Sequence, residues 1–410
     1  MDFARFNQGK IRQAGSVEQR YLNIDLILGK KHANVSLGLS PNHSANRHLI
    51  DQQIKTLRAK IEHSDEDPYL MVKESIENSE SIAQDHLKDS RDMVSSIITR
   101  SEGLDLVGCY LQGPIYKGFF NSQGQVNWFS KSSFVLDMSV YHSGDRAIKQ
   151  RYADVRFDEG ALEQRIESAK VGLKLFDRAP VSLNPGSYRV YFSPSAVHEM
   201  LSLINWGGFS KKSLEVKNSP LRLLYDQQKQ LSPDFSLSEN IASGIGCNFQ
   251  SQGFIKPGHL SLIEDGCLQR ALISPKTAKE YHLLHNGADD SEMMCSMDMK
   301  EGQLLEGDIL PTLEEGLVVN DLWYLNFSDH QHGCLTGMTR FLCYTVKDKK
   351  PVAPFSVMRF DDSIYRIFGQ NLKHLTKKRE LIIDSETYDE RSTSCATVPG
   401  IIAENVRFTL

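Results

Sequence analysis

The amino-acid sequence predicts an α+β protein, in which a mixed N-terminal α+β domain precedes a larger, β-rich C-terminal domain of curved, mainly antiparallel sheets. Helical spacing supports the first part, because Ile50, Ile54, Leu57 and Ile61 fall 4, 3 and 4 residues apart and therefore share one face of a helix. Residues 321–369 support the second part. There, runs rich in β-branched and aromatic residues alternate with Gly, Asp and Lys turns, a pattern typical of a β-meander.

The domain division rests on local composition. We assign residues 1–178 to the N-terminal domain and residues 179–410 to the C-terminal domain, because residues 178–186 hold two prolines and a glycine. Besides the helix above, the expected elements are helices at 81–99 and 161–177, and strands at 5–12, 18–35, 107–111, 115–121, 126–129 and 133–141. Turns are expected at Gly113 with Pro114 and at Gln123 with Gly124. Only four residues precede the strand expected at 5–12.

Composition limits the classes of function. The chain of 410 residues has a formal net charge of -5 and therefore lacks the basic footprint of a nucleic-acid-binding protein. Its seven cysteines form no CxxC pair, which is typical of reduced thiols in the cytoplasm. The chain's first residues lack the apolar core of a signal peptide, and no run approaches the length of a membrane span. We therefore predict a cytoplasmic protein that binds neither nucleic acid nor membrane.

A strand followed by a helix carries the first candidate site residues. The strand is expected at 188–192, after which Ser193 suits the N-cap and Pro194 the first helical position. The apolar stripe that should face the core consists of Val197, Leu201 and Ile204. His198 and Glu199 are then expected on the more solvent-exposed face of a short amphipathic helix.

An ordered set of segments resembles the TldD/PmbA family, once called modulators of DNA gyrase, which comprises zinc metallopeptidases and their non-catalytic partners. The segments that carry the resemblance are 240–254, 262–268, 274–278 and 314–319, followed by the meander at 321–369. The resemblance extends over most of the chain, from about Phe6 to Leu410. In the family a helix and a strand precede the strand that residues 5–12 resemble, so the resemblance implies an N-terminal domain truncated at its start. It implies a protein that dimerises and acts on short, extended or unfolded peptides.

The resemblance also implies a metal site. In catalytic members a His-Glu-x-x-x-His helix supplies two zinc ligands and a general base, and an open coordination position activates water. His198 matches the first ligand and Glu199 the base, but the second ligand position holds Leu203, preceded by Ser202. Neither residue binds zinc. The alternative is that His198 and Glu199 only occupy the wet face of their helix.

Three further residues are candidate zinc ligands. Cys395 lies in about the place of the family's third ligand, a Cys before the last strand, although it is also one of seven scattered cysteines. His330 and His332 flank Gln331, and alternating His residues on an extended strand point to one face. They are the best substitutes for the lost ligand. In a loop, they would instead be exposed to solvent.

Three functions remain open at this stage. The favoured one is a non-catalytic subunit that forms a homodimer, or a heterodimer with a TldD-like catalytic subunit, around a cavity for extended peptides. The second is an active zinc peptidase in which His198, Glu199 and an atypical ligand set carry the reaction. The third is an interaction or scaffold protein without a peptide cavity or a metal. Bound zinc would distinguish the second from the others.

Overall fold

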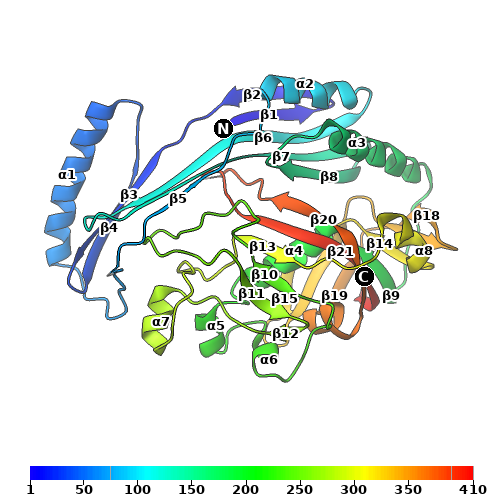
Figure 1. Ribbon diagram of the computed structural model, residues 1–410. Coiled ribbons are helices and arrows are strands. Elements are labelled where there is room, and N and C mark those ends of the chain that lie inside the picture. The colour runs from blue at the N-terminus through cyan, green and yellow to red at the C-terminus, as the bar shows by residue number, and fades with distance from the viewer. Residues whose placement is uncertain (74, 389, 410) are drawn as a thin grey trace.

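Two large β-sheets pack against each other, and a helical arm extends from one end of the molecule (Figure 1). The computed structural model describes residues 1–73, 75–388 and 390–409. Its N-terminal sheet has six strands and its C-terminal sheet thirteen, and most strand pairs are antiparallel. The predicted α+β class with a larger β-rich C-terminal part is confirmed. The division at residue 178 stays a prediction.

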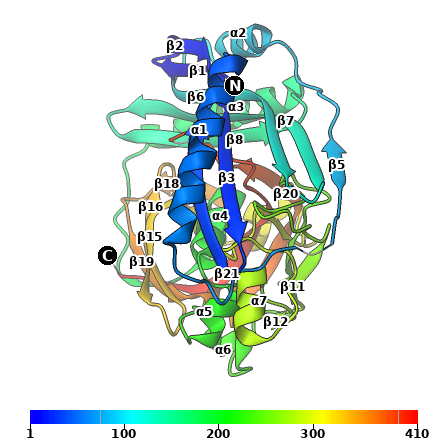
Figure 2. The ribbon, with the colours of Figure 1, turned by 90° about the vertical axis from the view of Figure 1, so that its left-hand side faces the viewer.

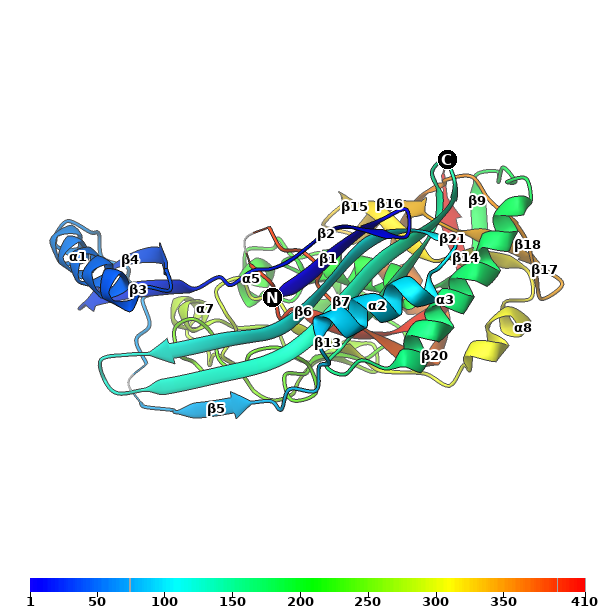
Figure 3. The ribbon, with the colours of Figure 1, turned by 90° about the horizontal axis from the view of Figure 1, so that it is seen from above.

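The N-terminal sheet has the strand order β2-β1-β6-β7-β5, with β8 paired to β7 beside β5. Its strands are β1 (Asp2–Asn7), β2 (Lys10–Ser16), β5 (Ser79–Ile82), β6 (Asp105–Phe120), β7 (Val126–Ser143) and β8 (Arg146–Asp154). Helices α2 (Ser90–Arg100) and α3 (Glu159–Leu173) lie over one half of its outer face (Figure 3). A core that includes Ile97, Phe134 and Ile166 joins them to the strands. The 3-10 helix η1 (Lys174–Asp177) follows α3.

Several N-terminal expectations need correction. Residues 5–12 form a hairpin of β1 and β2 instead of one strand, and no turn occurs at 113–114, where β6 runs straight through. The strands expected at 126–129 and 133–141 are parts of the single strand β7. Residues 81–89 are not helical, because α2 begins only after Asp89, whose side chain accepts a hydrogen bond from the Arg91 backbone N–H at 2.8 Å. Local capping chemistry thus fixes the helix start.

The arm consists of β3 (Tyr21–Leu28), β4 (Lys31–Gly38) and α1 (His43–Glu62), which form a two-stranded hairpin with one helix against it (Figure 2). The strands expected at 18–35 and the helix with the Ile50–Ile61 stripe are both present. Asn42 caps α1 by accepting a hydrogen bond from Ala45 N–H at 3.1 Å. The arm's own buried cluster holds only Ala33, Leu57 and Ile61.

The C-terminal domain is built around strand β21 (Cys395–Phe408), which pairs with β9, β13, β19 and β20. The other strands are β9 (Gly186–Phe192), β10 (Leu237–Glu239), β11 (Leu260–Glu264), β12 (Cys267–Leu268), β13 (Ser296–Met299), β14 (Gly316–Val319), β15 (Asp321–Asp329), β16 (Cys334–Arg340), β17 (Tyr344–Lys347), β18 (Lys350–Pro354), β19 (Arg359–Ser363) and β20 (Leu372–Ile383). The helices are α4 (Pro194–Asn205), α5 (Lys211–Glu215), α6 (Arg222–Tyr225), α7 (Pro275–Tyr281) and α8 (Ile309–Leu313), with the short turns η2 (Glu306–Asp308) and η3 (Arg366–Gln370). Strands β15 to β19 lie in the region where a β-meander was predicted, but their pairing is not that of a meander. Strand β16 pairs with β15 and β19, whereas β17 pairs with β14 and β18, so sequence neighbours such as β16 and β17 are not paired.

Apolar contacts and the buried cation Arg391 help to join the two sheets. Val135 and Ala153 of the N-terminal sheet share a buried cluster with Ile245 and Ile383 of the C-terminal domain. The Arg391 guanidinium donates hydrogen bonds of 2.7 Å to the backbone carbonyls of Gly113 and Ser133. The inner face of the N-terminal sheet is therefore a structural part of the second domain's core. Within the described parts of the chain, none of the helices has the length and apolar character needed to cross a membrane.

Candidate functional site

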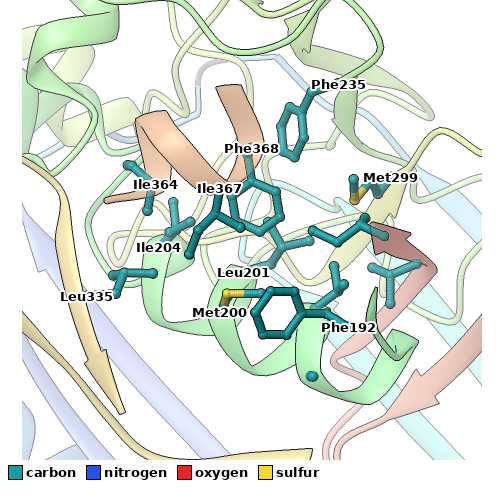
Figure 4. Packing of buried hydrophobic residues seen from close by; sticks show 14 of the residues in the cluster. Phe192, Met200, Leu201, Ile204, Phe235, Met299, Leu335, Ile364, Ile367 and Phe368 are labelled. Carbon is teal, nitrogen blue, oxygen red and sulfur yellow. The ribbon is translucent and has the colours of Figure 1, made fainter. Parts of the chain in front are cut away.

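The β9–α4 unit places the candidate residues as the sequence predicts. Ser193 caps α4 by accepting a hydrogen bond from Ala196 N–H at 3.3 Å, and Pro194 occupies the first helical turn. One side of α4 enters the main core, where Met200, Leu201 and Ile204 lie among buried residues of other segments, such as Phe192 and Phe368 (Figure 4). This burial fixes the rotation of the helix about its axis. His198 and Glu199 are left on the partly exposed side.

Glu199 forms an ion pair with Arg151, although its side chain is 31% exposed. Its Oε1 atom accepts a hydrogen bond from Arg151 Nη2 at 2.9 Å, and Arg151 belongs to β8 of the N-terminal domain. The same guanidinium donates to Ser195 Oγ at 2.6 Å and lies 3.8 Å from Asp321 Oδ2. A general base needs a carboxylate oxygen directed at its proton donor. Here an Arg engages that carboxylate.

Three carboxylates surround Arg151. Besides Glu199 and Asp321, Asp137 Oδ2 lies 3.8 Å from Arg151 Nε, and Asp137 also pairs with Lys149. Burial by itself would lower the pKa of Arg151, but the negative charges of Asp321, Glu199 and Asp137 raise it. We call Asp137, Lys149, Arg151, Ser195, Glu199 and Asp321 the Arg151 network. It joins the N-terminal sheet to α4 and to the start of β15.

Asp321 is the most buried acid of the Arg151 network, with a side chain only 4% exposed. Its Oδ2 atom accepts a hydrogen bond from Ser195 Oγ at 3.0 Å. Burial raises its pKa from 3.8 to about 6, because the charge of Arg151 only partly compensates for lost solvation and Glu199 opposes ionisation. A carboxyl group that titrates near neutral pH therefore lies beside Glu199.

His198 lies one residue before Glu199 and contacts a different group. Both of its ring nitrogens are 3.4 Å from Ser202 Oγ, so either can form the single hydrogen bond. Burial, and then the charge of Arg151, lower its pKa to about 4. The imidazole is therefore neutral at pH 7, as a metal ligand must be. Leu203, at the position of the second ligand in the family motif, packs against the main core instead.

Cys395 lies at the start of β21, in a separate environment. Its thiol is buried and 3.4 Å from Ser296 Oγ, and its backbone N–H donates to the Cys295 carbonyl at 2.9 Å. Burial raises the pKa of the thiol, which works against the thiolate form that zinc requires. Its apolar neighbours include Ile245 and Ile383. Among the described parts of the chain, the contacts of Cys395 and those of His198 share no residue.

His330 and His332 lie in the turn that joins β15 to β16. The ring of His330 packs edge-on against Phe327 with centroids 4.7 Å apart, whereas His332 Nδ1 lies 2.7 Å from Asp329 Oδ2 in an exposed position. Both contacts stay within their own hairpin. His332 therefore occupies the exposed loop position that the sequence left open as the alternative.

The donor set does not fit the three-ligand zinc site that the resemblance implies. Over residues 1–73, 75–388 and 390–409, no group of three or more His, Cys, Asp or Glu side chains could hold a metal ion. The charge around His198 agrees, because the Arg151 cation lowers the pKa of His198 and would likewise repel a metal cation at its ring. His198, Glu199, Cys395, His330 and His332 stay predictions as site residues.

Sequence reasoning missed the Arg151 network. Arg151 and Glu199 are 48 residues apart, and Ser195 and Asp321 are 126 apart, so no local motif joins them. The one available signal was Ser195, a hydroxyl in the first turn of the helix that also carries Glu199. The other members come from strands whose pairing only the fold determines.

The C-terminal domain, which carries α4, relates this chain to metallopeptidases. Residues 185–410 match the model of the PmbA/TldA metallopeptidase C-terminal domain. The chain therefore belongs to the TldD/PmbA family. No curated protein matches the chain.

Solved structures share this fold over the whole chain. TldE from Thermococcus kodakarensis superposes with a TM-score of 0.78 at 16% identity, covering 100% of this chain and 94% of that one. A protein from Thermotoga maritima named as a modulator of a DNA gyrase gives 0.76 at 10% identity, covering 99% and 93%. A similarly named protein from Bacteroides thetaiotaomicron gives 0.74 at 15% identity, covering 100% and 92%. At these identities the likeness establishes the fold.

Proposed function

We propose that this chain is a non-catalytic subunit of the TldD/PmbA type, which binds extended or unfolded peptides in the cytoplasm and leaves hydrolysis to a catalytic relative. The single observation that carries the proposal is the contact between Glu199 and Arg151. The residue in the place of the catalytic base is held by a cation, and the second ligand position holds Leu203. The ion pair of Glu199 and the replacement of the second ligand by Leu203 both work against the attack of a metal-activated water on a peptide bond.

The peptide-binding part rests on an open strand edge beside the Arg151 network. Among the described strands, β15 pairs only with β16, so its other edge is free to accept a strand. Asp321, a network member, is the first residue of β15. Farther along, Tyr324 is 72% exposed and its ring centroid lies 4.2 Å from that of Trp323. An extended peptide can add to such an edge through its main chain, with aromatic side chains as contact points.

The test combines zinc content with peptide hydrolysis and binding. Protein purified without chelators should contain no stoichiometric zinc and should not cleave a labelled unfolded peptide, yet should bind it by fluorescence anisotropy. Adding a TldD-like catalytic subunit should start cleavage. Stoichiometric zinc that disappears in His198→Ala, together with cleavage by the chain alone, would refute the proposal. Failure to bind peptide would instead indicate a scaffold protein.

One observation favours the active zinc peptidase as second candidate. His198 is neutral at pH 7 and makes only a weak contact to Ser202, so its ring can still bind a metal. Metal content of the native chain and of His198→Ala decides between the two. The matched control is His48→Ala, because His48 is exposed on α1 and is not among the candidate ligands.

A further inference from the structure

A half-buried arginine without a partner lies beside the free edge of β15. Arg340, the last residue of β16, forms no side-chain hydrogen bond and no ion pair within the described residues. The other described arginines that lack such a partner are all exposed to solvent. A guanidinium has five N–H donors and a permanent positive charge. An incompletely solvated cation of this kind is a candidate binding site for an anion.

Aromatic rings hold the guanidinium of Arg340 in place. Its central carbon lies 3.9 Å from the ring centroid of Trp323 and 4.8 Å from that of Phe341. The ring of Tyr324 lies against Trp323, with centroids 4.2 Å apart, and the buried Trp323 Nε1 has no acceptor within the described residues either. We call Trp323, Tyr324, Arg340 and Phe341 the Arg340 cluster. Stacking occupies the faces of the guanidinium and leaves the N–H groups in its plane for an acceptor.

Two residues of the Arg340 cluster have a strained backbone. Consecutive residues of a strand normally point to opposite faces, but Tyr324 and Phe341 each lie against the side chain of the residue before them. Their φ angles are 51° and 58°, and Tyr324 lies within a break in the register of β15 between Trp323 and Asn326. Bulky residues rarely adopt this left-handed conformation, and strained residues of this kind concentrate at binding sites.

The Arg340 cluster lies at one end of the free edge of β15. Arg340 pairs with Asp321, which is the first residue of β15. The preceding strand β14 pairs with β9 and β17 instead, so the free edge begins at this point. A peptide strand that adds antiparallel to β15 therefore has its C-terminus at the end where Arg340 lies, whereas a parallel strand has its N-terminus there.

The charge of Arg340 favours one of these two orientations. The guanidinium attracts the C-terminal carboxylate of a peptide and repels an N-terminal ammonium group. The adjacent Arg151 network limits the negative charge that can bind, because its three carboxylates outnumber its two cations. Lys149 of that network lies 5.9 Å from the ring centroid of Phe341. A carboxylate, with a single negative charge, therefore fits this place better than a phosphate group.

We propose that the Arg340 cluster binds the C-terminal carboxylate of an extended peptide that adds antiparallel to the free edge of β15. The two carboxylate oxygens match two parallel N–H groups of the guanidinium. The inference rests on the proposed peptide-binding function and specifies which part of the peptide is recognised. Peptide binding in itself does not require it, so the two proposals can fail separately.

Fluorescence anisotropy with one unfolded peptide in two chemical forms tests the proposal. The peptide carries its fluorophore at the N-terminus and contains no Asp or Glu, so its C-terminus is its only carboxylate. The full chain should bind the free acid at least about tenfold more tightly than the C-terminal amide. Arg340→Met should abolish this preference, and Arg340→Lys, which keeps the charge but not the planar group, should retain part of it. Arg270→Met removes an exposed arginine outside the cluster and is the matched control, which should keep the full preference.

Several outcomes would overturn the proposal. Equal binding of the acid and the amide would do so while leaving the peptide-binding function intact, and a preference that persists in Arg340→Met would show that another group binds the carboxylate. An amidated peptide with one internal Asp that binds as tightly as the free acid would indicate recognition of a side chain. Failure of both forms to bind would refute the peptide-binding function itself. Circular dichroism checks that each variant is folded, and the comparison of acid with amide in wild type requires no variant.

Discussion

Replacing Asp321 by Asn should change how the stability of the protein depends on pH. In the wild type, burial raises the pKa of Asp321 from 3.8 to about 6. Below pH 4 the carboxyl group is protonated in both the folded and the unfolded chain, and its stability contribution is fully present. Between these two values the folded chain holds a proton that the unfolded chain has released, so unfolding becomes easier as pH rises. Well above pH 6 the stability contribution of the protonated Asp321 carboxyl group is completely lost.

The size of the effect follows from the two pKa values. A difference of one in pKa corresponds to about 1.36 kcal/mol, so the interval from 3.8 to about 6 amounts to about 3 kcal/mol. Asn has no carboxyl proton to lose, and it retains a side-chain oxygen that can accept the Ser195 hydrogen bond. Arg151 keeps Glu199 and Asp137 as counter-charges. In Asp321→Asn, the free energy of unfolding should therefore not show this decrease as the pH rises.

Urea unfolding followed by circular dichroism between pH 3.5 and 8 provides the assay. The free energy of unfolding of Asp321→Asn minus that of wild type should rise by up to about 3 kcal/mol between pH 4 and pH 7. Asp290→Asn, at an exposed position, is the control and should give a curve parallel to wild type. Parallel curves for Asp321→Asn as well would show that the carboxyl group is not held in a poorly solvated site, and the electrostatic reasoning would be wrong.

Three further experiments test the site and the core. Arg151→Met should lower the free energy of unfolding by about 2–3 kcal/mol in urea titrations, which is less than the 3–5 kcal/mol of a fully buried pair because Glu199 is 31% exposed. As a control, Arg20→Met breaks an exposed pair with Glu18 and should lower it by under about 1 kcal/mol. Leu201→Ala should cost about 2–5 kcal/mol, since Leu201 is 1% exposed in the main core, whereas Leu284→Ala should stay within about 0.5 kcal/mol. Iodoacetamide should label exposed Cys267 well before buried Cys395 in the native protein, and both equally in urea, as mapped by mass spectrometry. Equal native rates would contradict the burial of the Cys395 thiol.

Sequence patterns predicted correctly those elements that depend on interactions within a few residues. Ser193, Pro194 and the stripe through Leu201 predicted α4 because capping and helical periodicity act within a few residues. The turn expected at Gly113 and Pro114 is absent for a non-local reason. Strand β1 ends its pairing with β6 at Gln112, so Pro114 lies at a free edge where its missing N–H breaks no ladder. Whether a proline ends a strand thus depends on a neighbour that the sequence does not identify.

The sequence predicted Glu199 as a site residue but not its partner Arg151, for a related reason. The family match covers residues 185–410 and so includes Glu199 and Asp321, but it excludes Arg151, which lies on β8. Without that guanidinium, two acids would share a poorly solvated position with no cation between them. A bound divalent metal ion would neutralise the charges of Glu199 and Asp321, and in this chain the guanidinium of Arg151, from the N-terminal sheet, neutralises them instead. The ion pair between Arg151 and Glu199, on which the proposed non-catalytic function rests, therefore depends on how the N-terminal sheet packs against α4.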